Sequence, residues 1–254
     1  MDDNSYQPLQ NGIQKSFREQ ISYVEQKPTI GLQNIVSCYW SLATTNSLDR
    51  DFIYTVMPDA CIDIVFDAKN ATAPLIMTPH LNIEELNLGQ AFHYIGIRLL
   101  PGSLAHSAID PQAVVGKQQD VHQINNISLN QYDEQIRKTA DAKEQFATLQ
   151  QLATEMLTRN IVHENKLVAN VITGMQFGLS QEAIAQKIGY SPRQLRRKIK
   201  EQTGFSPVQL QRVLRFQMAL SPNDALLRFA DQSHLIKEFR RFTGSTFSTF
   251  KRKF

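Results

Sequence analysis

The first half of the chain consists of short apolar runs separated by turn residues. The runs IVSCYWSL, DFIYTVM and CIDIVF, with two more over residues 75–79 and 92–102, are rich in Ile, Val, Tyr and Phe, which favour strands. Proline, glycine and aspartate between the runs supply turns. This spacing predicts an antiparallel β-rich domain, a sandwich or small barrel, over residues 21–128. The polar residues 1–20 predict a loose N-terminal arm.

The pattern becomes helical at residue 129. Residues 129–160 contain no Pro or Gly, and they predict one or two linker helices over residues 129–162. Apolar side chains recur there with approximately helical spacing. Such a stripe is either core or a dimer contact, and the sequence leaves both open. Its members are Ile136, Ala140, Phe146, Leu149, Leu152, Met156 and Leu157.

The sharpest local signal is LSQEAIAQKIGYSPRQLRRKIKEQTGFSP, residues 179–207. Ser180 and Ser191 are N-caps for two short helices, and the glycine between them permits a tight turn. Leu195 and Ile199 point inward on the second helix. Its outward face is basic and carries Arg193, Arg196, Arg197 and Lys200.

A helix, a tight turn and a second helix with exposed arginines match a known way of docking on DNA. The second helix enters the major groove, where Arg reads guanine. The alternative is an ordinary helical hairpin with a solvated basic face. The charge distribution favours DNA: residues 165–254 carry 16 basic and 5 acidic side chains, a net charge of +11, whereas residues 1–164 carry 11 and 19, a net charge of −8.

Composition excludes other classes of protein. The chain has 254 residues, 42% of them hydrophobic, which favours a packed core over disorder. Neither its two cysteines, Cys38 and Cys61, nor its six histidines have the spacing of a metal site. No GxSxG, GxGxxG or P-loop motif is present, so we expect no catalytic residues, no cofactor and no metal. The polar, acidic N-terminus and the absence of a long apolar stretch predict a cytoplasmic protein without a membrane partner.

Two stretches carry a family resemblance. LSQEAIAQKIGYSPRQLRRKIKEQTGFSPVQLQRVLRFQ and FADQSHLIKEFRRFTGSTFSTF resemble the DNA-binding domain of AraC/XylS-type bacterial transcription regulators. The resemblance covers roughly residues 165–250. It implies an all-α domain, residues 163–254, with two helix-turn-helix units joined by a linking helix. The interval over residues 215–231 is shorter than the family pattern. Either the linking helix stops at Leu220, or the first helix of the second unit is a stub over residues 224–228, and in both cases the first unit is expected to dominate base readout.

The resemblance also implies which side chains face the grooves. The two recognition helices are expected over residues 191–202 and 231–243, with Leu195, Ile199, Leu235 and Phe239 in the core. The implied DNA-binding residues are Arg193, Gln194, Arg196, Arg197 and the outward Lys200 in the first helix, and Gln232, Ser233, Ile236 and Lys237 in the second.

The N-terminal half has a weaker resemblance. VMPDACIDIVFD (56–67) and YIGIRLLPGSLAHSA (94–108) resemble the β-rich N-terminal domain of one branch of AraC-type regulators. Buried charged side chains in a β pocket can orient a charged small molecule. The candidate effector-binding residues are Trp40, Asp59, Asp63 and Arg98. The alternative is a turn aspartate, an edge-strand salt bridge and a tryptophan that fills the core.

These observations predict an α+β fold: an antiparallel β-rich sensor or dimerisation domain, linker helices, and an all-α domain with two helix-turn-helix units. The expected function is that of a sequence-specific bacterial transcription regulator, nucleoid-associated when bound. Its expected partners are double-stranded operator or promoter DNA, a small-molecule effector, a second copy in a homodimer and, for an activator, RNA polymerase. Two alternatives replace the sensor with a metal-dependent cupin-like enzyme or with a pure protein-interaction domain.

Overall fold

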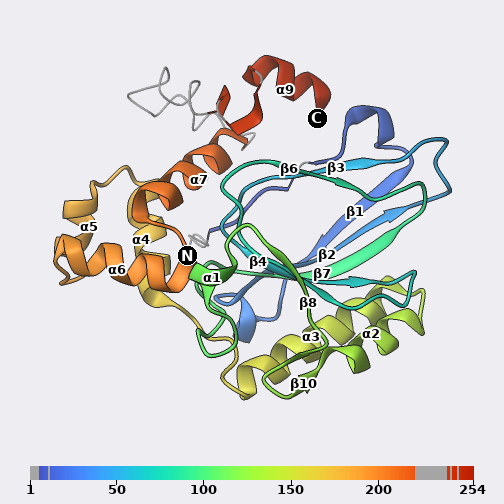
Figure 1. Cartoon of the computed structure of the whole chain (residues 1–254), viewed down its shortest axis with the longest axis horizontal. Helices are drawn as coiled ribbons and strands as arrows, with labels where there is room; N and C mark the ends of the chain where they lie inside the picture. The colour runs from blue at the N-terminus through green and yellow to red at the C-terminus, as the bar shows by residue number, and fades with distance from the viewer. Residues whose placement is uncertain (1–5, 11, 221–238, 241, 245) are drawn as a thin grey trace.

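The computed structural model describes residues 6–10, 12–220, 239–240, 242–244 and 246–254. An antiparallel β-rich region comes first and helices follow, so the predicted α+β class is confirmed (Figure 1). Within the described ranges, no helix combines the length and apolar character needed to cross a membrane.

A six-stranded antiparallel sheet is the centre of the β-rich region. Its strand order is β1-β2-β7-β4-β5-β8, and two short pairs, β3 with β6 and β9 with β10, stand beside it. The strands are β1 (Ile21–Gln26), β2 (Val36–Thr44), β3 (Ile53–Val56), β4 (Ile62–Asp67), β5 (Leu75–Met77), β6 (Glu84–Asn87), β7 (His93–Leu99), β8 (Gln118–Asp120), β9 (Gln123–Ile124) and β10 (Ile127–Ser128). Two 3₁₀ turns, η1 (Lys15–Phe17) and η2 (Ile30–Leu32), flank β1.

One face of this sheet packs against helices. Side chains alternate between the two faces of a strand, and Tyr39, Ile64 and Ile97 turn to the face covered by α2 (Leu129–Arg137) and α3 (Ala142–Thr158). Both helices lie below the sheet in Figure 1. All three side chains are fully buried.

Of the two interpretations of the helical stripe over residues 129–160, the core is confirmed and the dimer contact was wrong. Ile136, Leu149, Leu152 and Met156 are completely buried, and they share one hydrophobic cluster with the sheet. An amphipathic helix needs an apolar surface to cover its stripe, and the sheet of the same chain provides it. The two helices therefore extend the β-rich region.

The opposite face of the sheet is covered by the N-terminal segment and by the pair β3–β6. Phe17, from η1, stacks edge-on against Phe52 with ring centroids 5.1 Å apart. Tyr6 is only 8% exposed and donates a hydrogen bond to the backbone oxygen of Asp59. Residues 6–10 and 12–20 are therefore not a loose arm, because a few apolar side chains anchor a segment of polar composition.

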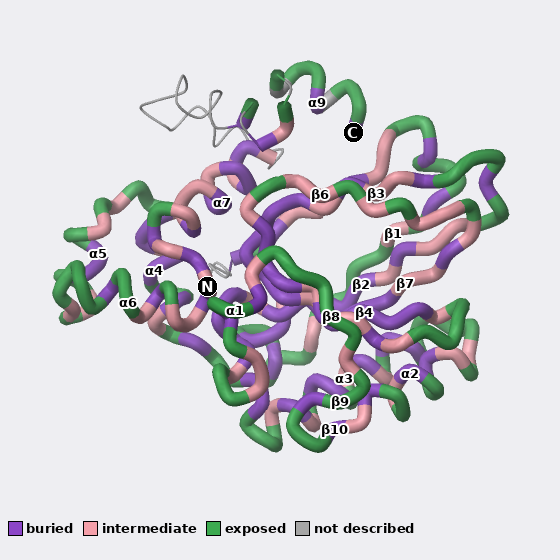
Figure 2. Tube along the Cα trace, in the orientation of Figure 1, coloured by how far each residue is buried: buried purple, intermediate pink, exposed green. Residues whose placement is uncertain are grey.

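Helices α4 (Lys166–Gln176), α5 (Gln181–Lys187), α6 (Pro192–Thr203) and α7 (Pro207–Leu220) follow, and α9 (Phe247–Lys253) lies near the C-terminus. A short helix, α1 (Pro111–Val114), belongs to the β-rich region. The interior of α4–α7 is continuous with that region, since Tyr6, Ala60 and Cys61 lie in the same cluster as Val171 and Leu195. Figure 2 shows the buried segments of the two parts meeting between them. The halves therefore share a core.

The predictions for the second recognition helix cannot be compared with the structure. Gln232, Ser233, Ile236 and Lys237, and the core position Leu235, lie outside the described residues. Phe239 is described and is buried, as the sequence predicts.

Candidate functional site

Helix α6 begins with a complete capping box. The hydroxyl of Ser191 accepts a hydrogen bond from the Gln194 backbone N–H, and the Gln194 side-chain oxygen accepts one from the Ser191 N–H. Pro192 occupies the first turn, where its missing N–H is not needed. Gly204 ends the helix with a φ of 76°. The start that the sequence predicts is therefore confirmed.

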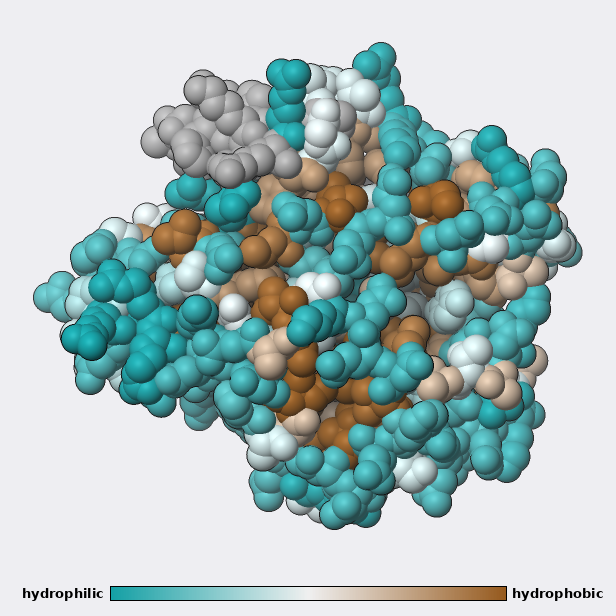
Figure 3. All heavy atoms as spheres, viewed as in Figure 1, coloured by the Kyte–Doolittle hydropathy of each residue, from teal (hydrophilic) through white to brown (hydrophobic). Residues whose placement is uncertain are grey.

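The two faces of α6 differ sharply. Leu195 and Ile199 are at most 1% exposed and pack into the core of α4–α7. The opposite face is solvent-exposed, and we call it the basic face: Arg193, Arg196, Arg197 and Lys200. Strongly hydrophilic atoms cover the end of the molecule where α5 and α6 lie (Figure 3).

The polar side chains of α6 are not equally available. Arg197 forms an ion pair with Glu201 at 2.6 Å, one helical turn away. No ion pair holds Arg193, Arg196 or Lys200 within the part of the chain that the structure describes. Gln194, predicted to face the groove, uses its side-chain oxygen in the capping box. The capping box does not engage its side-chain NH₂ group.

The far end of α6 is held by the β-rich region. The side-chain amide of Asn165 donates to Gly102 O at 2.9 Å and to Gln202 Oε1 at 3.0 Å. A Cβ added at Gly204 would lie 2.6 Å from Pro111 O, so α1 packs tightly on the helix end. The C-terminal end of α6 is thus fixed while its N-terminal half projects into solvent.

A cavity of about 310 Å³ lies between the pair β3–β6 and the sheet face that points away from α2 and α3. We call it the sheet cavity. Its lining is mainly apolar and aromatic, with a few polar groups, which is the usual character of a small-molecule site. The lining residues that matter below are Tyr23, Trp40, Tyr54, Asp63, Tyr94 and Arg98.

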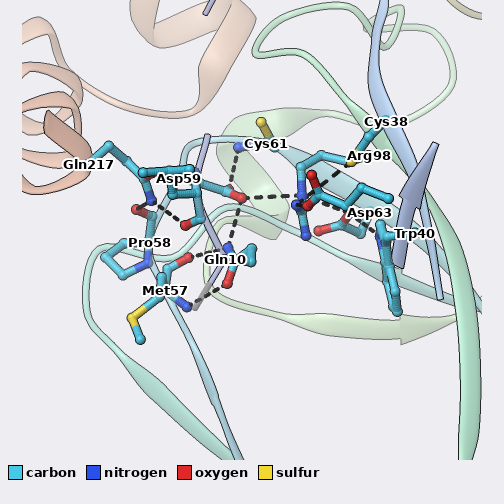
Figure 4. A network of polar contacts seen from close by, with 12 residues as sticks. Gln10, Cys38, Trp40, Met57, Pro58, Asp59, Cys61, Asp63, Arg98 and Gln217 are labelled. Carbon is cyan, nitrogen blue, oxygen red and sulfur yellow. Dashed lines mark hydrogen bonds and ion pairs between the residues drawn. The ribbon is translucent and has the colours of Figure 1, made fainter. Parts of the chain in front are cut away.

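Arg98 is the centre of a buried charge network (Figure 4). Its Nε lies 3.2 Å from Asp63 Oδ1 and 3.4 Å from Asp59 Oδ2, and its Nη1 lies 3.5 Å from Glu25 Oε1. Asp63 also accepts a hydrogen bond of 2.8 Å from the indole N–H of Trp40. Arg98 is 4% exposed. Charges this deeply buried are tolerated only when they are paired.

Asp59 connects this network to the rest of the molecule. One of its oxygens accepts from the Cys61 backbone N–H and the other from Gln10 Nε2. Next to it, Gln217 of α7 donates to Pro58 O at 2.8 Å. The turn at residues 58–59 therefore touches both the charge network and the helical part.

Burial changes the acidity of the groups in the sheet cavity. Loss of hydration raises the pKa of Asp63 to about 6, although Arg98 opposes the rise. Burial also raises the pKa of the Cys38 thiol to about 12. Cys38 and Cys61 are both free and buried, and a thiol that stays protonated is inert.

The structure brings together three of the four residues predicted to bind an effector. Trp40, Asp63 and Arg98 line the sheet cavity, whereas Asp59 lies behind Arg98 as its partner. Arg98 lies on the central strand β7, but one of its ion-pair partners, Glu25, lies on the edge strand β1, so the alternative of an edge-strand salt bridge holds for that pair. Asp59 does occupy a turn, so that part of the alternative interpretation is confirmed.

Sequence reasoning missed Tyr23, Tyr54 and Glu25. Tyr23 and Glu25 are two residues apart on β1, so their side chains lie on the same face of the sheet. This period of two could have revealed a strand next to β2 that presents side chains to the same face. Among the described residues, no group of three or more His, Cys, Asp or Glu side chains is placed to hold a metal ion.

Comparison with known proteins adds one finding. Residues 24–115, from β1 to α1, match a family model described as a domain of unknown function (DUF6597). The matched segment includes most of the lining of the sheet cavity. The search of curated proteins found no match, and the search of solved structures found none either.

Proposed function

We propose that the chain is a sequence-specific DNA-binding transcription regulator. In this proposal α5 and α6 form a helix-turn-helix unit, and α6 is its recognition helix. The observation that carries the proposal is the basic face: its exposed cations stand on a helix whose start is fixed by a capping box and whose end is held by α1. The domain matched by residues 24–115 is associated with AraC-like regulators, which supports the assignment.

The basic face would act in two ways. Arginine and lysine neutralise phosphates and release counterions, so binding weakens steeply as salt rises. Arginine side chains near the helix N-terminus reach base edges in the major groove and discriminate guanine. Arg193 and Arg196 are the strongest candidates, since neither is engaged in an ion pair with a described residue. Arg197 must first leave Glu201.

A second unit would extend the footprint. Gln232, Ser233, Ile236 and Lys237, which the sequence places on a second recognition helix, would enter the next major groove about 34 Å away. In this arrangement α6 supplies most of the base readout.

The β-rich region would be the sensor. The sheet cavity suits a small-molecule effector, and the core shared with α4–α7 offers a physical route by which its occupancy changes the presentation of α6. The cavity weighs against a pure protein-interaction domain, which needs no internal space. A homodimer would double the contacts with DNA, and an activator would in addition contact RNA polymerase.

The test selects sequences that the purified chain binds from a random DNA pool at two salt concentrations. We expect the parent to enrich one sequence motif, and we expect Arg196→Ala to lose this enrichment. Lys143→Ala, on the exposed side of α3, is the matched control and should select the same motif as the parent. If the parent enriches no motif, or if Arg196→Ala selects the same motif with equal strength, the proposal is wrong.

A further inference from the structure

The sheet cavity has an unusually aromatic lining. Four rings contribute, from Tyr23 on β1, Trp40 on β2, Tyr54 on β3 and Tyr94 on β7. Trp40 and Tyr54 come from the two structures that enclose the cavity, the sheet and the pair β3–β6. Rings that surround a cavity attract cations through their electron-rich faces, most strongly when the site excludes water.

The fixed charges around the cavity are mainly negative. Arg98 is the only cation among the lining residues that the structure describes, and Asp63 contributes a carboxylate beside it. The second lining carboxylate, that of Glu85, is exposed and forms an ion pair with Lys253 at 3.8 Å. Arg98 has two further acidic neighbours, Asp59 and Glu25. Three carboxylates therefore lie within 3.5 Å of one guanidinium group, and this part of the site keeps an excess of negative charge.

An anionic ligand would meet this site at a disadvantage. Its natural partner is Arg98, but the guanidinium group already lies within 3.5 Å of Asp63, Asp59 and Glu25. A new carboxylate would add a further negative charge to this group in a medium that screens poorly. A cation instead offsets the excess, and it favours the ionised form of Asp63, whose pKa burial has raised.

The size and polarity of the cavity describe the rest of the ligand. About 310 Å³ is at the lower end of volumes that hold small molecules. Apolar side chains such as Leu42, Val65 and Leu75 complete the lining. These surfaces contact hydrocarbon and leave little for a heavily hydroxylated molecule to hydrogen-bond.

We propose that the sheet cavity binds a small, mainly apolar organic cation, an ammonium group on an aromatic or aliphatic body. Asp63 holds the charge, and the rings of Trp40, Tyr23, Tyr54 and Tyr94 surround it. Only one part of this proposal rests on the proposed function: that the bound cation is the effector that modulates DNA binding. Binding itself is independent of DNA and is measured without it.

The experiment uses the fluorescence of the full chain, because Trp40 is its single tryptophan and lines the cavity. Three probes with the same ring differ in charge: benzyltrimethylammonium, benzyl alcohol and benzoate. The cation is expected to change the emission and to bind about tenfold more tightly than either of the others. The proposal is overturned if benzoate or benzyl alcohol binds equally well or better, or if the cation does not bind.

A variant locates the charge. Asp63→Asn keeps the shape and an acceptor for the Trp40 N–H but removes the negative charge, and it should lose about tenfold in affinity for the cation. Glu144→Gln, on the exposed side of α3, is the control for net charge and should bind like the parent. Equal affinity of Asp63→Asn and the parent would overturn the assignment.

The probe series on the parent chain gives a result even if Asp63→Asn does not fold. It also separates this proposal from the DNA assay, since either result can fail while the other stands.

Discussion

Trp40 of β2 donates its indole hydrogen bond to Asp63 of β4, at 2.8 Å, across the strand that lies between them. That strand is β7, and the residue paired with Trp40 on it is Gly96. Since glycine has no side chain, the indole ring can lie over β7 and reach the neighbouring strand. The hydrogen bond between Trp40 and Asp63 thus depends on Gly96, a third residue that has no side chain of its own.

The first prediction concerns Gly96→Ala. A Cβ there would lie 2.8 Å from Trp40 Cζ2 and 2.7 Å from Ile64 O, and the backbone oxygen cannot move aside cheaply. We expect a loss of about 1–3 kcal/mol in the free energy of unfolding, with a change in Trp40 emission. Urea denaturation followed by fluorescence measures both. Gly31→Ala is the control, because nothing lies within 4 Å of its added methyl group, and equal stability of the two variants would contradict the prediction.

The second prediction concerns pH. Because the pKa of Asp63 is about 6 in the folded chain, against an ordinary value of 3.8 for a hydrated aspartate, the folded state keeps this proton to higher pH. The stability from Asp63 is complete below pH 3.8 and is lost as the pH rises through about 6. Over that window the unfolding free energy of the parent should fall relative to that of Asp63→Asn.

Urea titrations of both proteins at several pH values measure this difference. The charged groups that face Asp63 act in opposite directions, since Arg98 lowers its pKa and Asp59 raises it. Other ionisable groups at the site are Glu25, Glu85, Tyr23 and Tyr54. They are present in both proteins, so their titration largely cancels in the comparison. Parallel stability curves for parent and variant would show that Asp63 titrates normally.

The helix start at α6 could be predicted from the sequence because its causes are local. A serine cap, a proline in the first turn and a glycine after the last turn lie within fourteen residues, from Ser191 to Gly204. The sheet cavity depends on long-range register. Trp40, Asp63 and Arg98 could be chosen by residue type, but only the pairing of β2, β7 and β4 brings them together.

The helices after residue 129 show a different limit. The spacing of Leu149, Leu152 and Met156 indicates correctly that one face of α3 is covered. It does not identify the covering surface, because a sheet and a second protomer present equally apolar faces to a helix. The N-terminal segment is similar, since Tyr6 and Phe17 anchor a stretch whose average composition is polar.

The third prediction concerns the basic face of α6. Arg196→Ala and Arg193→Ala should each weaken specific DNA binding by about 1–3 kcal/mol if a bidentate base contact is lost. The loss for Arg197→Ala should be smaller, because its ion pair with Glu201 offsets part of the gain from a DNA contact. Affinities for the selected motif, measured at matched salt, test this order. Equal losses for all three variants would show that the ion pair does not persist in solution or costs nothing to break.

The fourth prediction concerns Arg98, which is 4% exposed and stands between Asp59 and Asp63. Arg98→Met fills much of the same space but leaves two poorly hydrated carboxylates facing each other without a cation. Removing one partner of a buried ion pair typically costs about 3–5 kcal/mol, and we expect that loss of stability at neutral pH. The exposed pair Arg159–Glu155 supplies the control: Arg159→Met should cost at most about 1 kcal/mol, since water screens that pair.

Adding Asp63→Asn to Arg98→Met should recover part of the loss, because it removes one of the unpaired charges, and the two changes should therefore be non-additive. Urea denaturation of the single and double variants measures the coupling. If the two losses simply add, Arg98 stabilises the sheet through packing alone, and the charge balance inferred for the sheet cavity is wrong.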